Sequence, residues 1–180
     1  MFSLEVNGAL QLRQLEGHQA PLIFALTEKN RADLRRWLPW LDDNTTEEDS
    51  RSFIDSGLER YTNRESLELG IWHREALVGM VAFNRFSWDA RNGELGYWLD
   101  AEARGQGIMT RSCRALIAHA FAELDLNRVE IRCAAGNAPS RAIPERLGFR
   151  QEGQLRQVEW LYDHFVDHIV YGLLAGEELR

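Results

Sequence analysis

One amphipathic segment in the second half of the sequence most constrains the fold. Its apolar residues recur at i, i+4, i+7, i+8, i+11, i+12 and i+15, namely Met109, Cys113, Leu116, Ile117, Ala120, Phe121 and Leu124. This spacing places them on one face of a helix with 3.6 residues per turn. We therefore predict a helix from about Gly107 to Leu124, whose apolar face must be buried against another layer of secondary structure.

Strand patterns lie on both sides of this helix. Alternating or apolar runs bounded by turn residues predict strands over residues 67–71, 77–83, 94–99, 129–134, 151–161 and 165–174. The N-terminal part adds a short strand over 10–15 and helical patterns over 18–30, 31–37 and from Thr45 to about Tyr61. Thr45 and Glu48, three residues apart, predict a capping box at the start of the last of these helices.

The length and the order of these elements predict the fold class. A chain of 180 residues corresponds to about one domain. The first three strands after the N-terminal helices read as an antiparallel meander, and the second half alternates helix and strand. Residues 1–180 are therefore predicted to form a single α+β domain with a mixed sheet.

The charge balance and composition exclude several classes of protein. The chain has 21 Lys+Arg and 28 Asp+Glu, a net charge of −7, which argues against general binding to nucleic acids or anionic membranes, because both need basic surfaces. No apolar run reaches the roughly 20 residues of a membrane span, and the N-terminus lacks the pattern of a signal peptide. The two cysteines, Cys113 and Cys133, predict buried core residues rather than a disulfide framework. We expect a cytoplasmic protein.

A glycine-rich loop joins the predicted strand 94–99 to the amphipathic helix. It contains Arg104-Gly105-Gln106-Gly107. Glycines let backbone amides approach an anion closely, and the free amides at a helix N-terminus favour a phosphate there. The loop lacks the Gly-Lys-Ser/Thr of a Walker loop and the third glycine of a dinucleotide-binding loop. Taken alone, it fits either a phosphate site or an ordinary glycine turn before a helix.

A second strand–turn–helix segment runs from Asn137 to Phe149. It follows the predicted strand 129–134, with Pro139 in the first turn of a short helix and Gly148 just past its end. Asn137 is a candidate N-cap for this helix. On this ground alone, the segment needs no function beyond connecting strand to helix.

Together, the two segments resemble the GNAT superfamily of acyl-CoA-dependent N-acetyltransferases. Arg104-Gly105-Gln106-Gly107 is similar to the family's pyrophosphate-binding signature, and Asn137–Phe149 resembles its later segment with the Asn and the terminal Leu-Gly-Phe. Met109 stands where the wider family has Gly or Ala, a position at which RimL-like members accept a larger residue. The stretches that resemble the RimJ/RimL-type subgroup, which acetylates N-termini of ribosomal proteins, are Trp37–Trp40, Gly96–Leu99, Gly107–Thr110 and Asp167-His168.

The resemblance, which covers nearly the whole chain, implies a GNAT-like fold and a site for acetyl-CoA. The family's twisted, mostly antiparallel sheet has two splayed central parallel strands, here 94–99 and 129–134, with the pantetheine arm between them. The pyrophosphate is expected on the amides of Gly105 to Thr110, and Asn137 is expected to bond the pantetheine arm. The full predicted cofactor-binding set is Tyr97, Trp98, Leu99, Arg104, Gly105, Gln106, Gly107, Ile108, Met109, Thr110 and Asn137.

The implied reaction is direct attack of a neutral amine on the acetyl thioester. Glu159 is the predicted general base, because RimL-like proteins carry a glutamate at the matching position. Ser140 is the predicted acid that protonates the departing thiolate, with Tyr162 and Tyr97 as reserve candidates. The plainer alternatives are a solvated strand glutamate and an ordinary residue at a helix start.

Two other features have open interpretations. His164 and His168 would lie about 13 Å apart on a strand, so no metal site is expected; Asp167 and His168 would instead line the acceptor pocket or belong to the strand ladder. The aromatic stretch Trp37–Trp40 is expected either to form a wall of the acceptor cleft or to cover the core.

Functions from three classes stay open on the sequence. The favoured one is acetyl-CoA-dependent N-acetylation of the N-terminal α-amino group of a protein, with a ribosomal protein as the expected acceptor. The same chemistry on a small amine, such as an antibiotic, polyamine or amino-acid derivative, is its variant. A non-catalytic acyl-CoA-binding module would keep the Arg104–Thr110 loop but lose Glu159 and Ser140, and a purely structural protein would not need the loop. No direct nucleic-acid or membrane partner is expected, and resemblance favours a homodimer.

Overall fold

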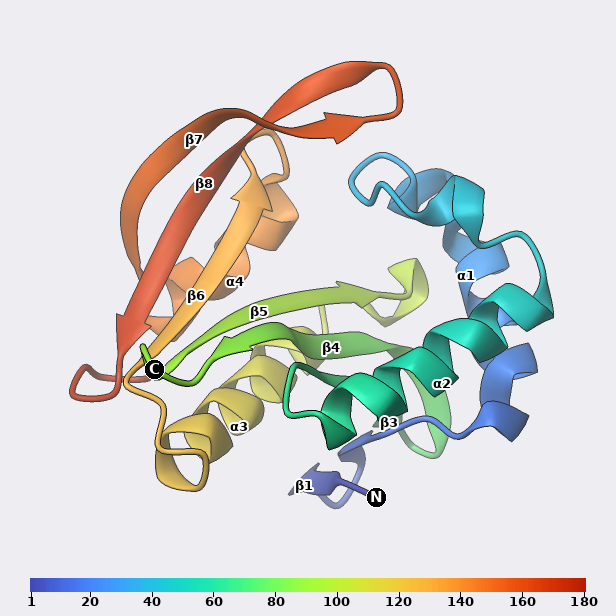
Figure 1. Cartoon of the computed structure of the whole chain (residues 1–180), viewed down its shortest axis with the longest axis horizontal. Helices are drawn as coiled ribbons and strands as arrows, with labels where there is room; N and C mark the ends of the chain where they lie inside the picture. The colour runs from blue at the N-terminus through green and yellow to red at the C-terminus, as the bar shows by residue number, and fades with distance from the viewer.

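An eight-stranded sheet in the order β1-β2-β3-β4-β5-β6-β8-β7 runs through the structure (Figure 1). The structure is a computed structural model and describes all 180 residues. Its strands are β1 (Ser3–Asn7), β2 (Leu10–Arg13), β3 (Leu67–His73), β4 (Ala76–Ser87), β5 (Asn92–Leu99), β6 (Arg128–Ala134), β7 (Arg150–Leu161) and β8 (His164–Leu174). Every neighbouring pair is antiparallel except β5 and β6, which are parallel. The expected mixed, mostly antiparallel sheet is confirmed.

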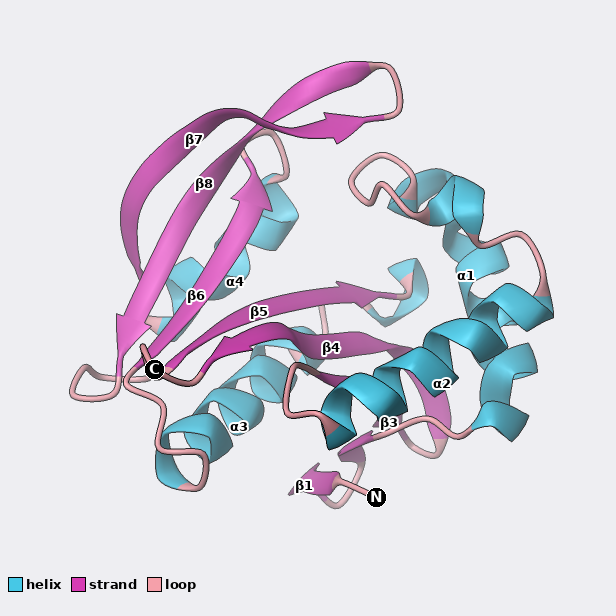
Figure 2. Cartoon of the chain, in the orientation of Figure 1, coloured by secondary structure: helices cyan, strands magenta, loops and turns pink.

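Helices cover both faces of the sheet (Figure 2). They are α1 (Ala20–Leu34), α2 (Glu47–Thr62), α3 (Ile108–Ala122) and α4 (Ala138–Leu147), with 3₁₀ turns at Gly17–Gln19, Leu41–Asp43 and Ala101–Ala103. Because side chains alternate along a strand, Met80 joins the apolar cluster of α1 and α2, whereas Val81 joins the larger cluster that includes α3. The layers therefore bury two separate clusters. None of the helices has the length and apolar character needed to cross a lipid bilayer.

The predicted amphipathic helix is confirmed as α3. Its residues Cys113, Leu116, Ile117 and Ala120 are completely buried in the main core. The helix begins directly after Gly107, whose φ of 70° lies in the left-handed region that favours glycine. The burial of this face fixes the helix against the sheet, and with it the position of its N-terminus beyond the end of β5.

The parallel strands β5 and β6 are paired over only part of their length. Their ladder joins Asn92–Leu95 to Arg128–Ile131. β5 then continues to Leu99 and β6 to Ala134, each still paired on its outer edge, to β4 and β8 respectively. Figure 1 shows the two strands diverging from their common start. The expected splay is confirmed, and it leaves backbone groups of both strands facing the gap.

The N-terminal part differs from expectation in three places. β1 was not expected, since its five residues carry little strand pattern; it is the edge strand that pairs with β2. The helical patterns over 18–30 and 31–37 merge into one helix, α1, which covers residues 20–34, because nothing between them breaks the helix; residues 35–37 form a turn instead. The capping box is one residue later than expected: Thr46, not Thr45, is the N-cap, and Asp49 replaces Glu48 as its partner. The shorter side chain of Asp49 completes the capping box, so the prediction of Thr45 and Glu48 as its members was wrong.

Candidate active site

A cavity of about 1460 Å³ opens between the diverging strands. It is bounded by β5, β6, the loop before α3, the start of α4, the β7–β8 hairpin and the segment between α1 and α2. The predicted site residues that line it are Tyr97, Trp98, Leu99, Arg104, Gly105, Gly107, Ile108, Met109, Thr110, Asn137, Ser140 and Glu159. Gln106 does not line it, and its side chain donates to the Glu102 carbonyl instead. The topology thus brings nearly all the predicted residues to one cavity.

The loop before α3 presents unpaired backbone donors. No amide from Gly105 to Thr110 donates to another group of the chain, and no side chain caps the helix start. Gly105 and Gly107 both have left-handed φ angles, of 74° and 70°. Successive amides in such a loop form a concave anion site, strengthened by the dipole of the helix that follows. The arrangement suits linked phosphates.

Arginines add positive charge to this end of the cavity. Arg104 pairs with Asp33 of α1 and donates to the Leu99 carbonyl at 3.3 Å, so it also fixes the loop to the rest of the protein. Arg36, Arg111 and Arg146 line the same cavity. Sequence reasoning missed these three, although Arg111 lies in the first turn of α3, one turn after the loop. They give an acidic chain a locally basic surface suited to an anionic ligand.

Ser140, Tyr97 and Cys133 meet where α4 begins. The Ser140 hydroxyl donates to Cys133 Sγ at 3.3 Å, and the Tyr97 hydroxyl donates to the Ser140 carbonyl at 2.9 Å. Burial holds the pKa of Tyr97 well above its usual value and also raises the pKa of the Cys133 thiol. Both groups therefore stay protonated near neutral pH, which leaves this corner uncharged.

Asn137 begins α4 in the way that the sequence indicates. Its side-chain oxygen accepts from the Ser140 amide at 3.2 Å, and the helix starts at the next residue, Ala138. The predicted N-cap is confirmed. This bond fixes the backbone of Ser140 at the start of α4, and the contact with Cys133 then places its hydroxyl.

Glu159 of β7 pairs with His168 of β8. The distance between Glu159 Oε2 and His168 Nε2 is 2.9 Å, and the two side chains are 25% and 18% exposed. Both line the cavity. Sequence reasoning proposed Glu159 as a base but did not link it to His168, because the strand register that joins them contains a bulge that no local pattern indicates. A carboxylate hydrogen-bonded to an imidazole can accept and pass on a proton.

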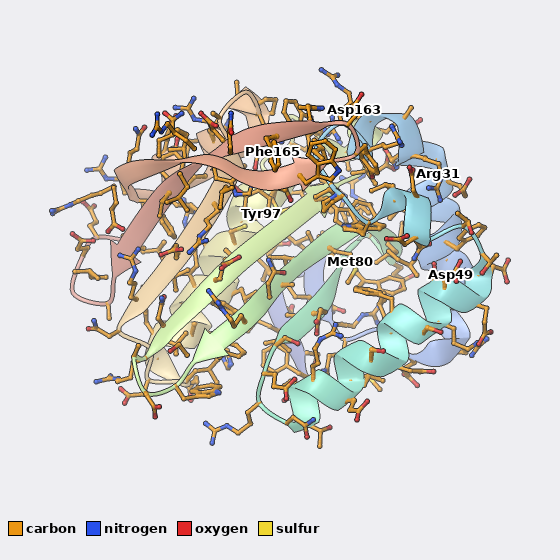
Figure 3. All side chains as sticks on the ribbon, turned by 45° about the horizontal axis from the view of Figure 1, so that its top comes forward. Arg31, Asp49, Met80, Tyr97, Asp163 and Phe165 are labelled. Carbon is orange, nitrogen blue, oxygen red and sulfur yellow. The ribbon has the colours of Figure 1, made fainter.

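The segment Trp37–Trp40, between α1 and α2, lines the cavity along its full length. Of the two roles left open, it takes that of the wall, while the following Leu41 is the buried residue. The Tyr162 hydroxyl, at the turn of the β7–β8 hairpin, donates to the Leu38 carbonyl at 2.6 Å and accepts from the Leu41 amide at 3.3 Å. Figure 3 shows the neighbouring Asp163 at this end of the hairpin, close to the helical region that carries Arg31. The hairpin turn is therefore joined to the wall.

The contacts of Tyr162 make it a poor candidate for the reserve acid. Its hydroxyl is bonded to the wall and does not line the cavity. The guanidinium of Arg35 lies over its ring, 3.8 Å from the centroid. Of the two reserve tyrosines, only Tyr97 borders the cavity, and its hydroxyl is committed to the Ser140 carbonyl.

The two histidines considered for metal binding do not converge. His164 pairs with Asp163 and His168 with Glu159. No group of three or more His, Cys, Asp or Glu residues is arranged to hold a metal ion.

Comparisons with known proteins agree on one type of domain. Residues 9–150 match the family described as acetyltransferase (GNAT) domain. The chain is 35% identical over 178 residues to the YdaF protein of Bacillus subtilis, covering 98% of this chain and 97% of that one. It is 32% identical over 177 residues to the ribosomal-protein-serine acetyltransferase of Escherichia coli, covering 98% of both. A solved structure of RimL, a ribosomal L7/L12 α-N-protein acetyltransferase in complex with coenzyme A, aligns with a TM-score of 0.93 and 28% identity, over 96% of this chain and 98% of that one.

Proposed function

The chain belongs to the GNAT acetyltransferase family, and from this we propose that it acetylates the N-terminal α-amino group of a protein, with a ribosomal protein as the acceptor. The observation that carries the proposal is the likeness, over 98% of both chains, to the ribosomal-protein-serine acetyltransferase of E. coli. The acetyl donor is acetyl-CoA. A cytoplasmic location and a homodimer stay predictions.

We assign the donor site to the cavity between β5 and β6. The unpaired amides of Gly105 to Thr110 would bind the pyrophosphate, with Arg111 and Arg146 beside them. The pantetheine arm would lie along Tyr97–Leu99, where β5 has no partner on its inner edge, and reach Asn137. In the RimL complex, coenzyme A forms a disulfide with a cysteine of that protein. In this chain Cys133 lines the cavity, beside Ser140.

The acceptor chemistry favours a chain terminus over a lysine. An α-amino group has a pKa of about 7.7–8.0, against about 10.4 for lysine. Roughly a tenth of an N-terminus is therefore neutral at pH 7, whereas almost no free lysine is. A modest base that removes one proton suffices for the terminus. The Glu159–His168 pair would be that base.

The proposed step is a single transfer in a ternary complex. The neutral amine attacks the thioester carbonyl carbon, a C–N bond forms, and the C–S bond breaks. Backbone donors of β5 would stabilise the developing oxyanion. Glu159, paired with His168, takes the proton that the nitrogen loses, directly or through a water molecule. The Ser140 hydroxyl gives a proton to the departing CoA thiolate and regains one from solvent.

A thiol-release assay with acetyl-CoA tests this function. The acceptors are peptides with the N-terminal sequences of ribosomal proteins, the same peptides with a blocked N-terminus, and a panel of small amines. We expect CoA release with the free peptides only, and mass spectrometry should place the acetyl group on the first residue. Turnover confined to small amines, or equal turnover of blocked and free peptides, contradicts the proposal; acetyl-CoA binding without any turnover supports a non-catalytic module.

A further inference from the structure

The ladder between β7 and β8 contains an irregular stretch next to the Glu159–His168 pair. Leu155 is opposite His168, and Glu159 is opposite Val166. Three residues of β7, numbered 156–158, therefore stand opposite Asp167 alone. A regular ladder has one residue on each strand at every step, so β7 carries two extra residues here.

The two extra residues determine what lies beside His168. Without them, Gln157 would be opposite Val166, and Glu159 would lie two positions, about 7 Å, farther toward the hairpin turn. Because an insertion of two residues preserves the alternation of faces, Glu159 stays on the face that carries Val166 and His168. The bulge thus brings the carboxylate to within 2.9 Å of the imidazole.

Asp167 holds this bulge together. One carboxylate oxygen accepts the Gln157 amide at 2.7 Å, and the other accepts Gln154 Nε2 at 2.6 Å. The φ of Gln157 is 49°, a left-handed conformation uncommon for residues other than glycine. The bond from the Gln157 amide, followed by that from Gln154, holds the pKa of the Asp167 carboxyl below its usual value, so it stays charged.

The backbone of Asp167 makes a second connection. Its carbonyl accepts the Ala135 amide at 2.8 Å, at the end of β6, where the chain turns toward Asn137 and Ser140. Asp167 itself does not line the cavity. It therefore lies outside the cavity assigned to the substrates, yet it contacts the strand segments that carry Glu159 and lead to Ser140.

We infer that Asp167 is a positioning residue, which sets Glu159 against His168 by holding the three-residue bulge of β7. This rests on the proposed role of Glu159 in acetyl transfer. The carboxylate acts on the backbone of residue 157, and the register it imposes places the base.

Kinetics of Asp167 variants test the inference. Asp167→Ala removes both acceptors and should lower kcat with an N-terminal peptide by about tenfold to a hundredfold, while KM for acetyl-CoA stays nearly unchanged. Asp167→Asn keeps an oxygen for the Gln157 amide and should recover most of the activity. Asp163→Ala, which removes an exposed carboxylate at the turn of the same hairpin, should behave as the unaltered protein.

Two further measurements decide the outcome. In a Glu159→Gln background, Asp167→Ala should not lower kcat further, because both changes remove the contribution of the base. If the two losses of kcat multiply in the double variant, or if Asp167→Ala alone keeps full activity, the inference is overturned. The ¹⁵N resonances of the His168 imidazole should shift in Asp167→Ala and not in Asp163→Ala. This second readout needs no acceptor, so it still tests the bulge if the chain acetylates no peptide; an unmoved His168 signal overturns the inference by itself.

Discussion

The candidate site residues of this protein occur as hydrogen-bonded pairs. Glu159 and His168 come from neighbouring strands, whereas Asn137 is the N-cap of α4 and Ser140 lies in its first turn. None of the pairs has a local sequence pattern apart from Asn137 with Ser140, whose spacing is that of an N-cap. The chemistry of the site therefore depends on contacts that only the sheet and the start of α4 create.

Replacing the candidate base should separate chemistry from binding. Glu159→Gln keeps the shape of the side chain and a hydrogen-bonding oxygen but removes the proton acceptor. We expect kcat to fall by a factor of about 10² to 10⁴. The affinity for acetyl-CoA, measured by calorimetry, should stay nearly the same, because Glu159 belongs to β7 and the Gly105–Thr110 loop lies between β5 and α3. An unchanged kcat would assign the base to another group.

Asp100 links the end of β5 to α1 and gives stability a dependence on pH. It is 6% exposed and accepts from Lys29 Nζ at 2.8 Å and from the Glu102 amide at 3.3 Å. Burial raises the pKa of the Asp100 carboxyl, but Lys29 and the amide outweigh it, so the pKa lies below its usual value. The stabilisation is complete above the unfolded pKa, about 3.9, and is lost as pH falls through the lower folded pKa.

Asp100→Asn should therefore lower the free energy of unfolding by about 1 kcal/mol at pH 7. The difference in the free energy of unfolding between the variant and the unaltered protein should become smaller below about pH 4. Urea unfolding followed by circular dichroism at both pH values measures it. A gap that widened in acid would show that the carboxyl is not stabilised in its charged form.

Helix α3 connects the core to the proposed donor site. The middle of the helix is buried in the core at Cys113 and Leu116, and its first turn and the loop before it carry the unpaired amides. This part of the fold could be predicted from sequence, because an apolar face of period 3.6 and a glycine loop are both local signals. The resemblance to a family, rather than any spacing, supplied the idea that β5 and β6 separate.

Elements whose form depends on distant partners could not be predicted in the same way. β1 is held by its pairing to β2, and the bulge in β7 by Asp167 on the next strand. The segment Trp37–Trp40 was ambiguous because an aromatic run is equally suited to a wall or to a core cover. Its place along the cavity decides the matter, and it is held there by Tyr162, 124 residues away from Leu38 in the chain.

A substitution in the loop before α3 tests that element. Gly107→Val places a β-branched residue at a φ of 70° and a Cβ 3.1 Å from the Arg111 side chain. The strain, about 1–3 kcal/mol, should distort the amides and weaken acetyl-CoA binding in calorimetry. Gly176→Val is the matched control, since a Cβ there meets nothing within 4 Å. Normal binding by Gly107→Val would exclude this loop as the phosphate site.

The whole molecule should respond to its donor as one cooperative unit, because a single sheet connects the cavity to both apolar clusters. A ligand that binds only the folded state stabilises it by about 2.7 kcal/mol at a hundred times its Kd. Acetyl-CoA should thus raise Tm in a thermal scan, and AMP at the same concentration should raise it less. An unchanged Tm at millimolar acetyl-CoA would refute the assignment of acetyl-CoA as the donor.

The bond between Tyr162 and Leu38 has a geometric consequence for the acceptor. It connects the turn of the β7–β8 hairpin to the segment between α1 and α2, and both the hairpin and that segment line the cavity. The cavity is therefore bridged on this side. If the acceptor enters beneath the bridge, we expect a slender, extended chain terminus to fit there more easily than a folded surface.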